Sequence, residues 1–187
     1  MTTLDTNKKS PHRHGAGDEH PLGHLGGFIG LAVFLAVWTL DSFVFRVSIV
    51  PAAVVPLPLR IAAAALFLAL AAYFSLKGHA VFEVDPERSD RPVQEGVFAR
   101  VRHPIYLGIL LFYFSLVLST LSLLALAVLA GIVLFFNAIA SYEEARLVEI
   151  FGDAYRDYRR RVPKWIPRLR PAASSPTLPA FRRGLGR

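Results

Sequence analysis

Residues 104–142 read PIYLGILLFYFSLVLSTLSLLALAVLAGIVLFFNAIASY, and none of them is Asp, Glu, Lys, Arg or His. As a single helix this run would be about 58 Å long, about twice the apolar thickness of a bilayer. The run therefore predicts two membrane spans joined by a tight turn. Because such a hairpin returns to the membrane face from which it started, the charged residues on its two sides should meet there.

The flanks of this run carry the first candidate functional residues. Arg102 and His103 directly precede the run, and Glu143 and Glu144 directly follow it. Ionisable groups at the mouth of a helical bundle often mark a functional site. Pro104 suits the first turn of a helix, where free N–H groups favour an anion. The alternative is that the Arg and His only anchor the chain at lipid head groups, and that both glutamates are only solvated.

The composition of the whole chain supports a membrane protein. Of its 187 residues 53% are hydrophobic, and the mean hydropathy is +0.42, too apolar for an ordinary soluble domain. The chain has no cysteine, which excludes disulfides and thiolate chemistry. The net charge of +7 does not indicate nucleic-acid binding, because nearly all Lys and Arg lie in the tails and the 77–103 loop. The positive-inside rule places that loop and both termini in the cytoplasm, so we expect an integral protein of the bacterial inner membrane.

The apolar segments predict an all-α, polytopic membrane bundle with about four spans in one domain, residues 23–170. A proline-rich turn is expected at 50–58, and Gly78 is expected to end the second helix. After the last span, a basic amphipathic segment interrupted at Gly152 is either a cytoplasmic helical lid or a plain surface anchor. The expected spans are residues 25–50, 59–76, 104–118 and 123–142, the lid is 143–170, and the disordered tails are 1–22 and 171–187.

Two further features need an interpretation. Asp41 lies within the first span, where a carboxylate is costly and usually has a role. We place it near the outer interface, with Arg46 as its partner. Histidines recur in the N-terminal tail and resemble a metal-binding tract, but a tail without a metal is the interpretation we prefer.

The motifs occur in an order that resembles one family. Residues 96–108 read GVFARVRHPIYLG, 143–147 read EEARL, 151–158 read FGDAYRDY, and Val162-Pro163 follows. This ordered set resembles the isoprenylcysteine carboxyl methyltransferase and phospholipid methyltransferase superfamily, over about residues 80–169. The resemblance implies an integral membrane enzyme that uses S-adenosylmethionine, requires no metal, and covers its cofactor with the C-terminal segment.

The resemblance also implies site residues by position. His103, Tyr106 and Glu143 would bind the cofactor, together with backbone groups of the loop that leads to residue 96. Two positions differ from the family: Phe98 stands where tyrosine is usual, and Ile139 stands where eukaryotic prenylcysteine enzymes have an arginine for the substrate carboxylate. The second difference argues against prenylcysteine specificity. The implied catalytic residues are Arg102, His103, Glu143 and Glu144, and the implied cofactor-binding residues are Val93, Gly96, Phe98, His103, Pro104, Tyr106 and Glu143.

The predicted function is S-adenosylmethionine-dependent methyl transfer to a lipophilic acceptor at the cytoplasmic membrane face. A lipid or prenylcysteine-like carboxylate, a phospholipid amine and a thiol all remain open as the acceptor. The alternative is a non-enzymatic membrane scaffold or transport subunit that reuses the fold. Transport is disfavoured because residues 104–142 contain almost no polar side chain.

Overall fold

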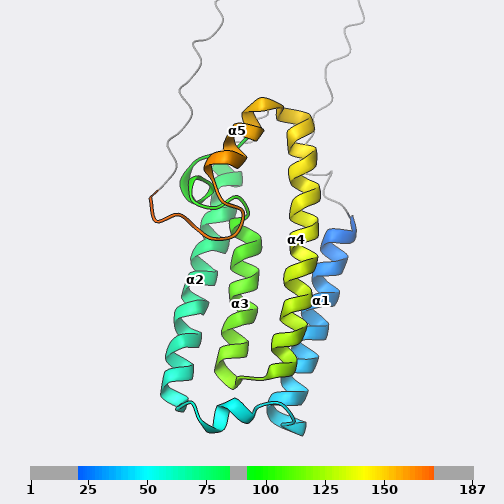
Figure 1. The fold of residues 1–187 in the computed structure, drawn as a ribbon, viewed down its shortest axis with the longest axis vertical. Helices are drawn as coiled ribbons and strands as arrows, with labels where there is room; N and C mark the ends of the chain where they lie inside the picture. Colours follow the sequence, from blue (N-terminus) through cyan, green and yellow to red (C-terminus); the bar gives the residue numbers. More distant parts are fainter. Residues whose placement is uncertain (1–20, 85–91, 171–187) are drawn as a thin grey trace, which may run out of the picture.

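The computed structural model describes residues 21–84 and 92–170, and within these residues it contains helices and no strand (Figure 1). The predicted all-α class is therefore confirmed. The expected tails lie outside the described residues, except for positions 21 and 22. The long helices are α1 (Pro21–Thr39), α2 (Leu57–Val84), α3 (Pro104–Thr120) and α4 (Leu123–Phe151), and a short α5 (Asp153–Arg161) follows them.

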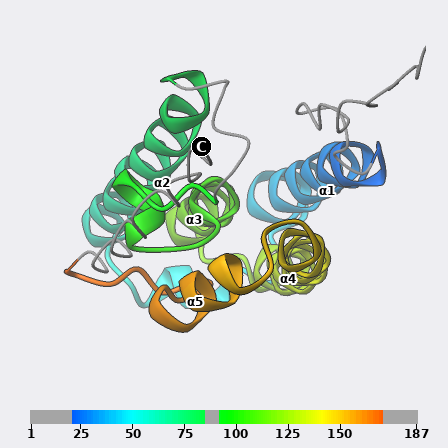
Figure 2. The same ribbon diagram turned by 90° about the horizontal axis from the view of Figure 1, so that it is seen from above.

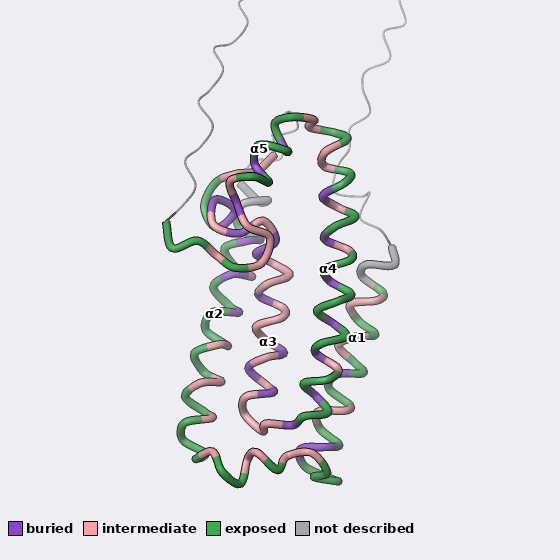
Figure 3. The backbone as a smooth tube through the Cα atoms, viewed as in Figure 1, coloured by how far each residue is buried: buried purple, intermediate pink, exposed green. Residues whose placement is uncertain are grey.

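Among the described residues, three segments are long and apolar enough to cross a membrane, namely Leu25–Phe45, Leu57–Ala80 and Leu123–Phe151. The fourth apolar helix, α3, has 17 residues and runs alongside the others between the same two ends of the bundle (Figure 1). The outward faces of the helices are exposed and carry large apolar side chains such as Phe28 (Figure 3). Such faces suit lipid rather than water, so the chain is an integral membrane protein.

Helices α2 and α3 approach each other most closely, and glycines make this possible. A Cβ atom on Gly108 would lie 2.9 Å from the Ala71 carbonyl oxygen and 3.0 Å from the Ser75 nitrogen. A Cβ atom on Gly78 would lie 2.7 Å from Cγ1 of Ile105. The prediction that Gly78 ends the second helix is wrong, because α2 continues to Val84. This glycine serves the close approach of α3, not a helix end.

Helix α1 lies beside α4, away from α2 (Figure 2). Phe34 of α1 is fully buried, and its ring centroid lies 4.6 Å from that of Tyr113 on α3. A Cβ atom on Gly26 would come within 2.4 Å of the Phe135 ring, so this glycine lets α1 pack closely against α4. Between α1 and α4 runs a groove of about 340 Å³ with almost wholly apolar walls, and Gly131 and Tyr113 are among its lining residues.

The end of the bundle at which α1 stops contains a buried carboxylate. After α1 the chain forms a π-helical turn (Leu40–Phe45) and then reverses at Arg46, which has a φ of 56°. Asp41 is only 2% exposed, and it accepts hydrogen bonds from the backbone N–H and hydroxyl of Ser48 and from the Ser122 hydroxyl. The predicted pairing of Asp41 with Arg46 is wrong, because the chain reversal brings Ser48 to the carboxylate and leaves the Arg46 side chain exposed.

The first span is also shorter than expected, because the reversal comes directly after Phe45 and not at residue 50. The proline-rich turn that follows contains a short 3-10 helix, Val50–Ala53, and gives way to α2 at Leu57. At the same end, the α3–α4 turn passes through Leu121 in the left-handed region, and the Ser122 hydroxyl accepts a hydrogen bond from the Ala125 N–H to cap α4. The Asp41 carboxylate therefore joins the end of α1 to this turn.

Candidate active site

The opposite end of the bundle begins with the loop that leads into α3. Gly96, with a φ of 59°, opens a single 3-10 turn, η3 (Gly96–Ala99). Apolar side chains of this turn are buried against α2, and Val93 packs against the same group. The loop is therefore fixed by hydrophobic packing before it reaches the charged residues. We call this group the η3 cluster, and its buried members are Phe74, Val97, Phe98 and Val101.

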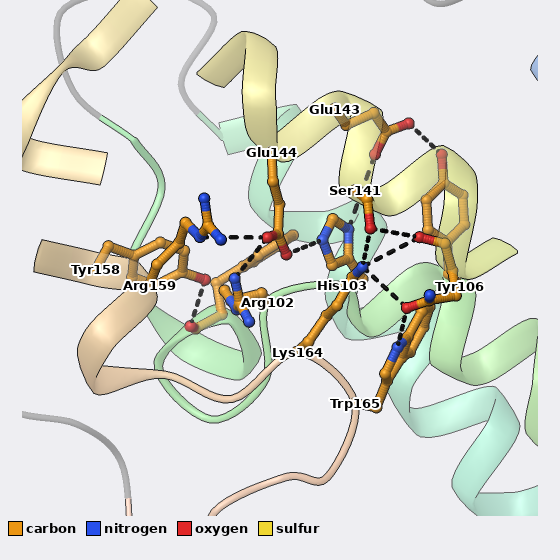
Figure 4. A network of polar contacts seen from close by, with 12 residues as sticks. Arg102, His103, Tyr106, Ser141, Glu143, Glu144, Tyr158, Arg159, Lys164 and Trp165 are labelled. Carbon is orange, nitrogen blue, oxygen red and sulfur yellow. Dashed lines mark hydrogen bonds and ion pairs between the residues drawn. The ribbon is translucent and has the colours of Figure 1, made fainter. Parts of the chain in front are cut away.

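Glu144 is the centre of the polar network at this end (Figure 4). It is 4% exposed, and it is the member of the adjacent glutamate pair that faces the interior. Its Oε2 lies 2.7 Å from Nη1 of Arg102 and 3.4 Å from Nε of Arg159, and its Oε1 lies 3.0 Å from Nε2 of His103. One buried carboxylate thus connects α4, the loop before α3, and α5.

His103 lies between the two glutamates. Its Nε2 meets Glu144, and its Nδ1 lies 3.8 Å from Oε2 of Glu143. Tyr106, one turn into α3, donates a hydrogen bond from its hydroxyl to Glu143 and stacks on the His103 ring, with the centroids 5.8 Å apart and the planes 10° apart. The carboxylate of Glu143, which is 38% exposed, is therefore held beside the imidazole.

Arg102 carries donors that the described residues do not satisfy. Its Nη1 contact with Glu144 is an ion pair without hydrogen-bond alignment. Neither Nε nor Nη1 has a hydrogen-bond partner within residues 21–84 and 92–170, although both atoms are buried. Such buried donors are costly unless a ligand or water completes them.

Helix α5 lies at this end of the bundle, beside α4 (Figure 2). The chain turns at Gly152, with a φ of 55°, and α5 buries Tyr155 and Tyr158. The Tyr158 hydroxyl donates to the Phe98 carbonyl oxygen at 2.8 Å, which ties α5 to the η3 turn. Burial raises the pKa of both phenols, and the neighbouring Glu144 adds to this effect. In the structure this segment packs on the loop before α3.

After α5, residues 162–170, which we call the strap, run across the start of α3. The Arg102 N–H donates to the Pro163 carbonyl oxygen at 3.0 Å, and the Arg168 N–H donates to the Arg100 carbonyl oxygen at 3.0 Å. The Trp165 ring lies 5.9 Å from the His103 ring, centroid to centroid. The strap therefore shields one side of the imidazole from water.

The strap also brings a lysine to α4. Nζ of Lys164 donates to the Ser141 hydroxyl at 2.7 Å and to the backbone and side-chain oxygens of Asn137 at 3.1 and 3.0 Å. Nε1 of Trp165 donates to the same Asn137 side chain at 3.1 Å. The sequence analysis missed these four residues. One signal was available, because positions 137, 141 and 144 have the spacing of a single helical face in an otherwise apolar segment.

The structure thus brings together five of the predicted site residues, with Pro104 buried in the first turn of α3 directly behind them. The side chains of Val93 and Phe98 pack in the η3 cluster instead, and Gly96 lies at its edge. Their part in cofactor binding stays a prediction. In the part of the chain that the structure describes, no group of three or more side chains could hold a metal ion. The five residues in one network are Arg102, His103, Tyr106, Glu143 and Glu144.

An all-helical membrane bundle with buried charged side chains at one end defines an integral membrane protein with a polar site at the bundle mouth. Residues 53–154 match the phospholipid methyltransferase family. Because this match covers more than half of the 187 residues, the chain belongs to that family.

Curated relatives of two kinds are similar to this chain. Protein-S-isoprenylcysteine O-methyltransferase of Schizosaccharomyces pombe is 44% identical over 80 residues, which are 40% of this chain and 32% of that protein. Methanethiol S-methyltransferase 1 of Bradyrhizobium diazoefficiens is 35% identical over 85 residues, 46% of this chain and 28% of that protein. The Homo sapiens isoprenylcysteine enzyme is 32% identical over 102 residues, 52% of this chain and 35% of that protein.

The matched part of this chain therefore spans only about a third of each of these relatives. No solved structure matches the chain.

Proposed function

We propose that this protein transfers a methyl group from S-adenosylmethionine to a lipophilic acceptor at the membrane surface. The observation that carries the proposal is the buried network in which Arg102, His103 and Tyr106 meet Glu143 and Glu144 at the mouth of the bundle. Membership of the phospholipid methyltransferase family and the methyltransferase names of the relatives support the same reaction.

The donor set of the site fits the methyl donor. When bound, S-adenosylmethionine supplies an activated methyl group on a sulfonium with its own leaving group, and it also carries an ammonium and a carboxylate. The partly exposed carboxylate of Glu143 suits the ammonium. The unsatisfied Nε and Nη1 donors of Arg102 suit the carboxylate. The ammonium and the carboxylate of the ligand therefore each have a complementary group in the network.

The protein residues would act mainly by holding and orienting. Glu144 fixes the His103 ring through Nε2, which leaves Nδ1 directed toward Glu143. Trp165 of the strap excludes water from one side of the His103 ring. Methyl transfer from a sulfonium is an in-line displacement, which needs the acceptor atom and the methyl carbon about 3 Å apart and aligned. A rigid site that holds donor and acceptor in this geometry is therefore the expected contribution of the fold. For an amine acceptor, Glu143, Glu144 or His103 would take the departing proton.

The groove between α1 and α4 supports a lipophilic acceptor. Its walls are apolar, and one of its lining residues, Phe136, also contacts the Tyr106 ring at a centroid distance of 5.1 Å. An apolar tail lying in this groove would have its polar end near the network. The groove therefore offers a route from the bilayer to the site that a small water-soluble acceptor would not need.

Calorimetric titration of the detergent-purified protein with S-adenosylmethionine and S-adenosylhomocysteine tests the proposal. We expect saturable binding by the wild type and its loss in a His103→Ala/Glu143→Ala double variant. The matched control is His79→Ala/Glu149→Ala, which makes the same changes at exposed positions outside the network. Absence of binding by well-folded wild type would overturn the proposal in favour of a non-enzymatic scaffold.

A further inference from the structure

Lys164 is held at the site by its backbone and by its side chain. The preceding residue, Pro163, accepts the backbone hydrogen bond from Arg102, so the strap is fixed beside the start of α3 at this point. The Lys164 ammonium then reaches across to α4 and donates to Asn137 and Ser141. Figure 4 shows the lysine beside His103, on the side where Tyr106 and Trp165 also lie.

The charge of this ammonium is not balanced by the side chains it contacts. Its partners in the described part of the chain are neutral oxygens, and no carboxylate there lies within ion-pair distance of it. Glu144 already binds Arg102, His103 and Arg159. Burial lowers the pKa of Lys164, and the nearby arginines lower it further against the opposing effect of Glu144. A half-buried cation in this state attracts an anion.

The position of the ammonium along α4 shows which ligand would supply that anion. Ser141 lies just under one helical turn, and Asn137 about two turns, from Glu144 toward the apolar middle of α4. With a rise of about 1.5 Å per residue, the lysine binds up to about 10 Å deeper than the buried glutamate. A position closer to the apolar middle of α4 favours an anion that reaches the site from the bilayer over a solute from the aqueous side.

We propose that Lys164 exchanges one of its three hydrogen bonds to Asn137 and Ser141 for a bond to an anionic oxygen group, carboxylate or phosphodiester, on the head group of the lipid acceptor. The proposal rests on the methyltransferase function above and sets its acceptor specificity. Lipids without an anionic group would lack this contact.

The charge balance of the transfer is simple for a carboxylate acceptor. A carboxylate oxygen forms a bond to the methyl carbon while the bond between that carbon and sulfur breaks, and the electron pair of the broken bond stays on sulfur. The acceptor anion becomes a neutral ester, the sulfonium becomes a neutral thioether, and no proton moves. The ester then has no charge for Lys164 to hold, which favours its release.

Three amphiphiles with one long tail and different head groups test the proposal, namely dodecanoate, methyl dodecyl phosphate and dodecanamide. Each is titrated into the full-length protein in a non-ionic detergent. We expect the wild type to bind at least one anionic amphiphile about tenfold or more tightly than the amide, because hydrogen bonds to charged groups have about that effect. Comparison of dodecanoate with methyl dodecyl phosphate distinguishes a carboxylate from a phosphodiester.

In Lys164→Met we expect this preference to disappear, while the affinities for the amide and for S-adenosylhomocysteine stay within about twofold. Lys164→Arg should keep part of the preference. Arg168→Met, which removes a positive charge from an exposed side chain of the same strap, should leave all affinities unchanged.

Equal or undetectable binding of all three amphiphiles by the wild type would overturn the inference. It would also be overturned if Lys164→Met weakened the binding of the anionic amphiphiles and of the amide equally, because the lysine would then only hold the strap in place. Weaker S-adenosylhomocysteine binding in that variant would assign the lysine to the carboxylate of the methyl donor instead. Failure of the proposed function itself would be seen separately, as no S-adenosylhomocysteine binding by the wild type.

Discussion

The two ends of the bundle each bury a carboxylate, and the two carboxylates have opposite surroundings. Asp41, at the end where α1 stops, receives hydrogen bonds from neutral groups of the described residues, among them the backbone N–H of Ser48 and two serine hydroxyls. Glu144, at the other end, is in contact with an imidazole and two guanidinium groups. Both residues are almost inaccessible, with 2% and 4% exposure.

This difference separates a structural carboxylate from one in a functional site. The donors around Asp41 hold two turns of the chain in place. Around Glu144 there is an excess of positive charge, and Arg102 retains donors without a hydrogen-bond partner in the described residues. A network with unsatisfied donors is completed by something outside it, whereas a satisfied network is not. Burial of a charge is therefore less informative than the nature and satisfaction of its partners.

The largest effect that we expect is the loss of stability in Asp41→Asn. An amide cannot accept all the hydrogen bonds that this carboxylate receives, and buried donors would be left unpaired, so the free energy of unfolding should fall by about 3 kcal/mol. Denaturant titration in detergent measures it, with the exposed Asp153→Asn as control. The affinity of the folded protein for S-adenosylhomocysteine should not change. If Asp41→Asn lowered this affinity as much as a substitution of Glu144, the distinction between a structural end and a functional end would be wrong.

Glu144→Gln should weaken ligand binding more than it lowers stability. It removes the charge that balances Arg102 and Arg159 and loosens the orientation of His103. We expect ligand affinity or kcat/KM to fall about tenfold to a hundredfold, which is typical when residues that orient a site are removed. The unfolding free energy should fall less than in Asp41→Asn. The exposed Glu149→Gln is the matched control, and wild-type activity in Glu144→Gln would contradict the assignment.

A substitution between the two ends tests whether the groove serves the site. A Cβ atom at Gly131 would meet nothing within 4 Å, so Gly131→Leu fills the groove without a clash at its first atom. We expect the affinity for a lipophilic acceptor to fall about tenfold, near the effect of losing one buried side chain contact. S-adenosylhomocysteine binding should stay unchanged. Gly131→Ala is the control, and equal acceptor kinetics in both variants would exclude the groove.

Alkaline pH should lower stability through two tyrosines at the site end, and this is the smallest effect. Tyr155 and Tyr158 have folded-state pKa values raised by burial above the ordinary value of 10.0. The unfolded chain therefore loses protons first as the pH rises past that value, and the folded state loses stability. At half a pH unit above the ordinary pKa of 10.0, each phenol should lower the free energy of unfolding by about 0.8 kcal/mol. Tyr158→Phe should reduce this slope; an unchanged slope would show that this phenol ionises normally.

Much of this arrangement is predictable from the order of apolar and charged segments. The uncharged run at 104–142 is too long for one span, and the hairpin that it forms brings His103 to Glu144. That prediction depends only on the length of the uncharged run and on the fact that its two spans return the chain to the same membrane face. Helix geometry adds that adjacent side chains point about 100° apart, so just one of the two adjacent glutamates faces the interior, and Glu144 is that residue.

Contacts that depend on close approach in three dimensions were not predictable. Gly78 has the features of a helix end, yet its role depends on a neighbour, Ile105, that is distant in sequence. Asp41 was assigned to the nearest arginine along the chain, because the sequence does not reveal the reversal that delivers Ser48. Lys164 was missed for a related reason, since the strap has no regular periodicity that would fix where its side chains point.

The contacts of Glu144 also have a consequence for biogenesis. The α3–α4 hairpin leaves the ribosome before residues 159–165 do, so at insertion its polar face has no partners from α5 or the strap. During that interval Arg102 and His103 are the groups of this network available to Glu144. The site is therefore completed after translocation of the hairpin, when the last segment docks, and a chain stalled before that point would be inserted in the bilayer but inactive.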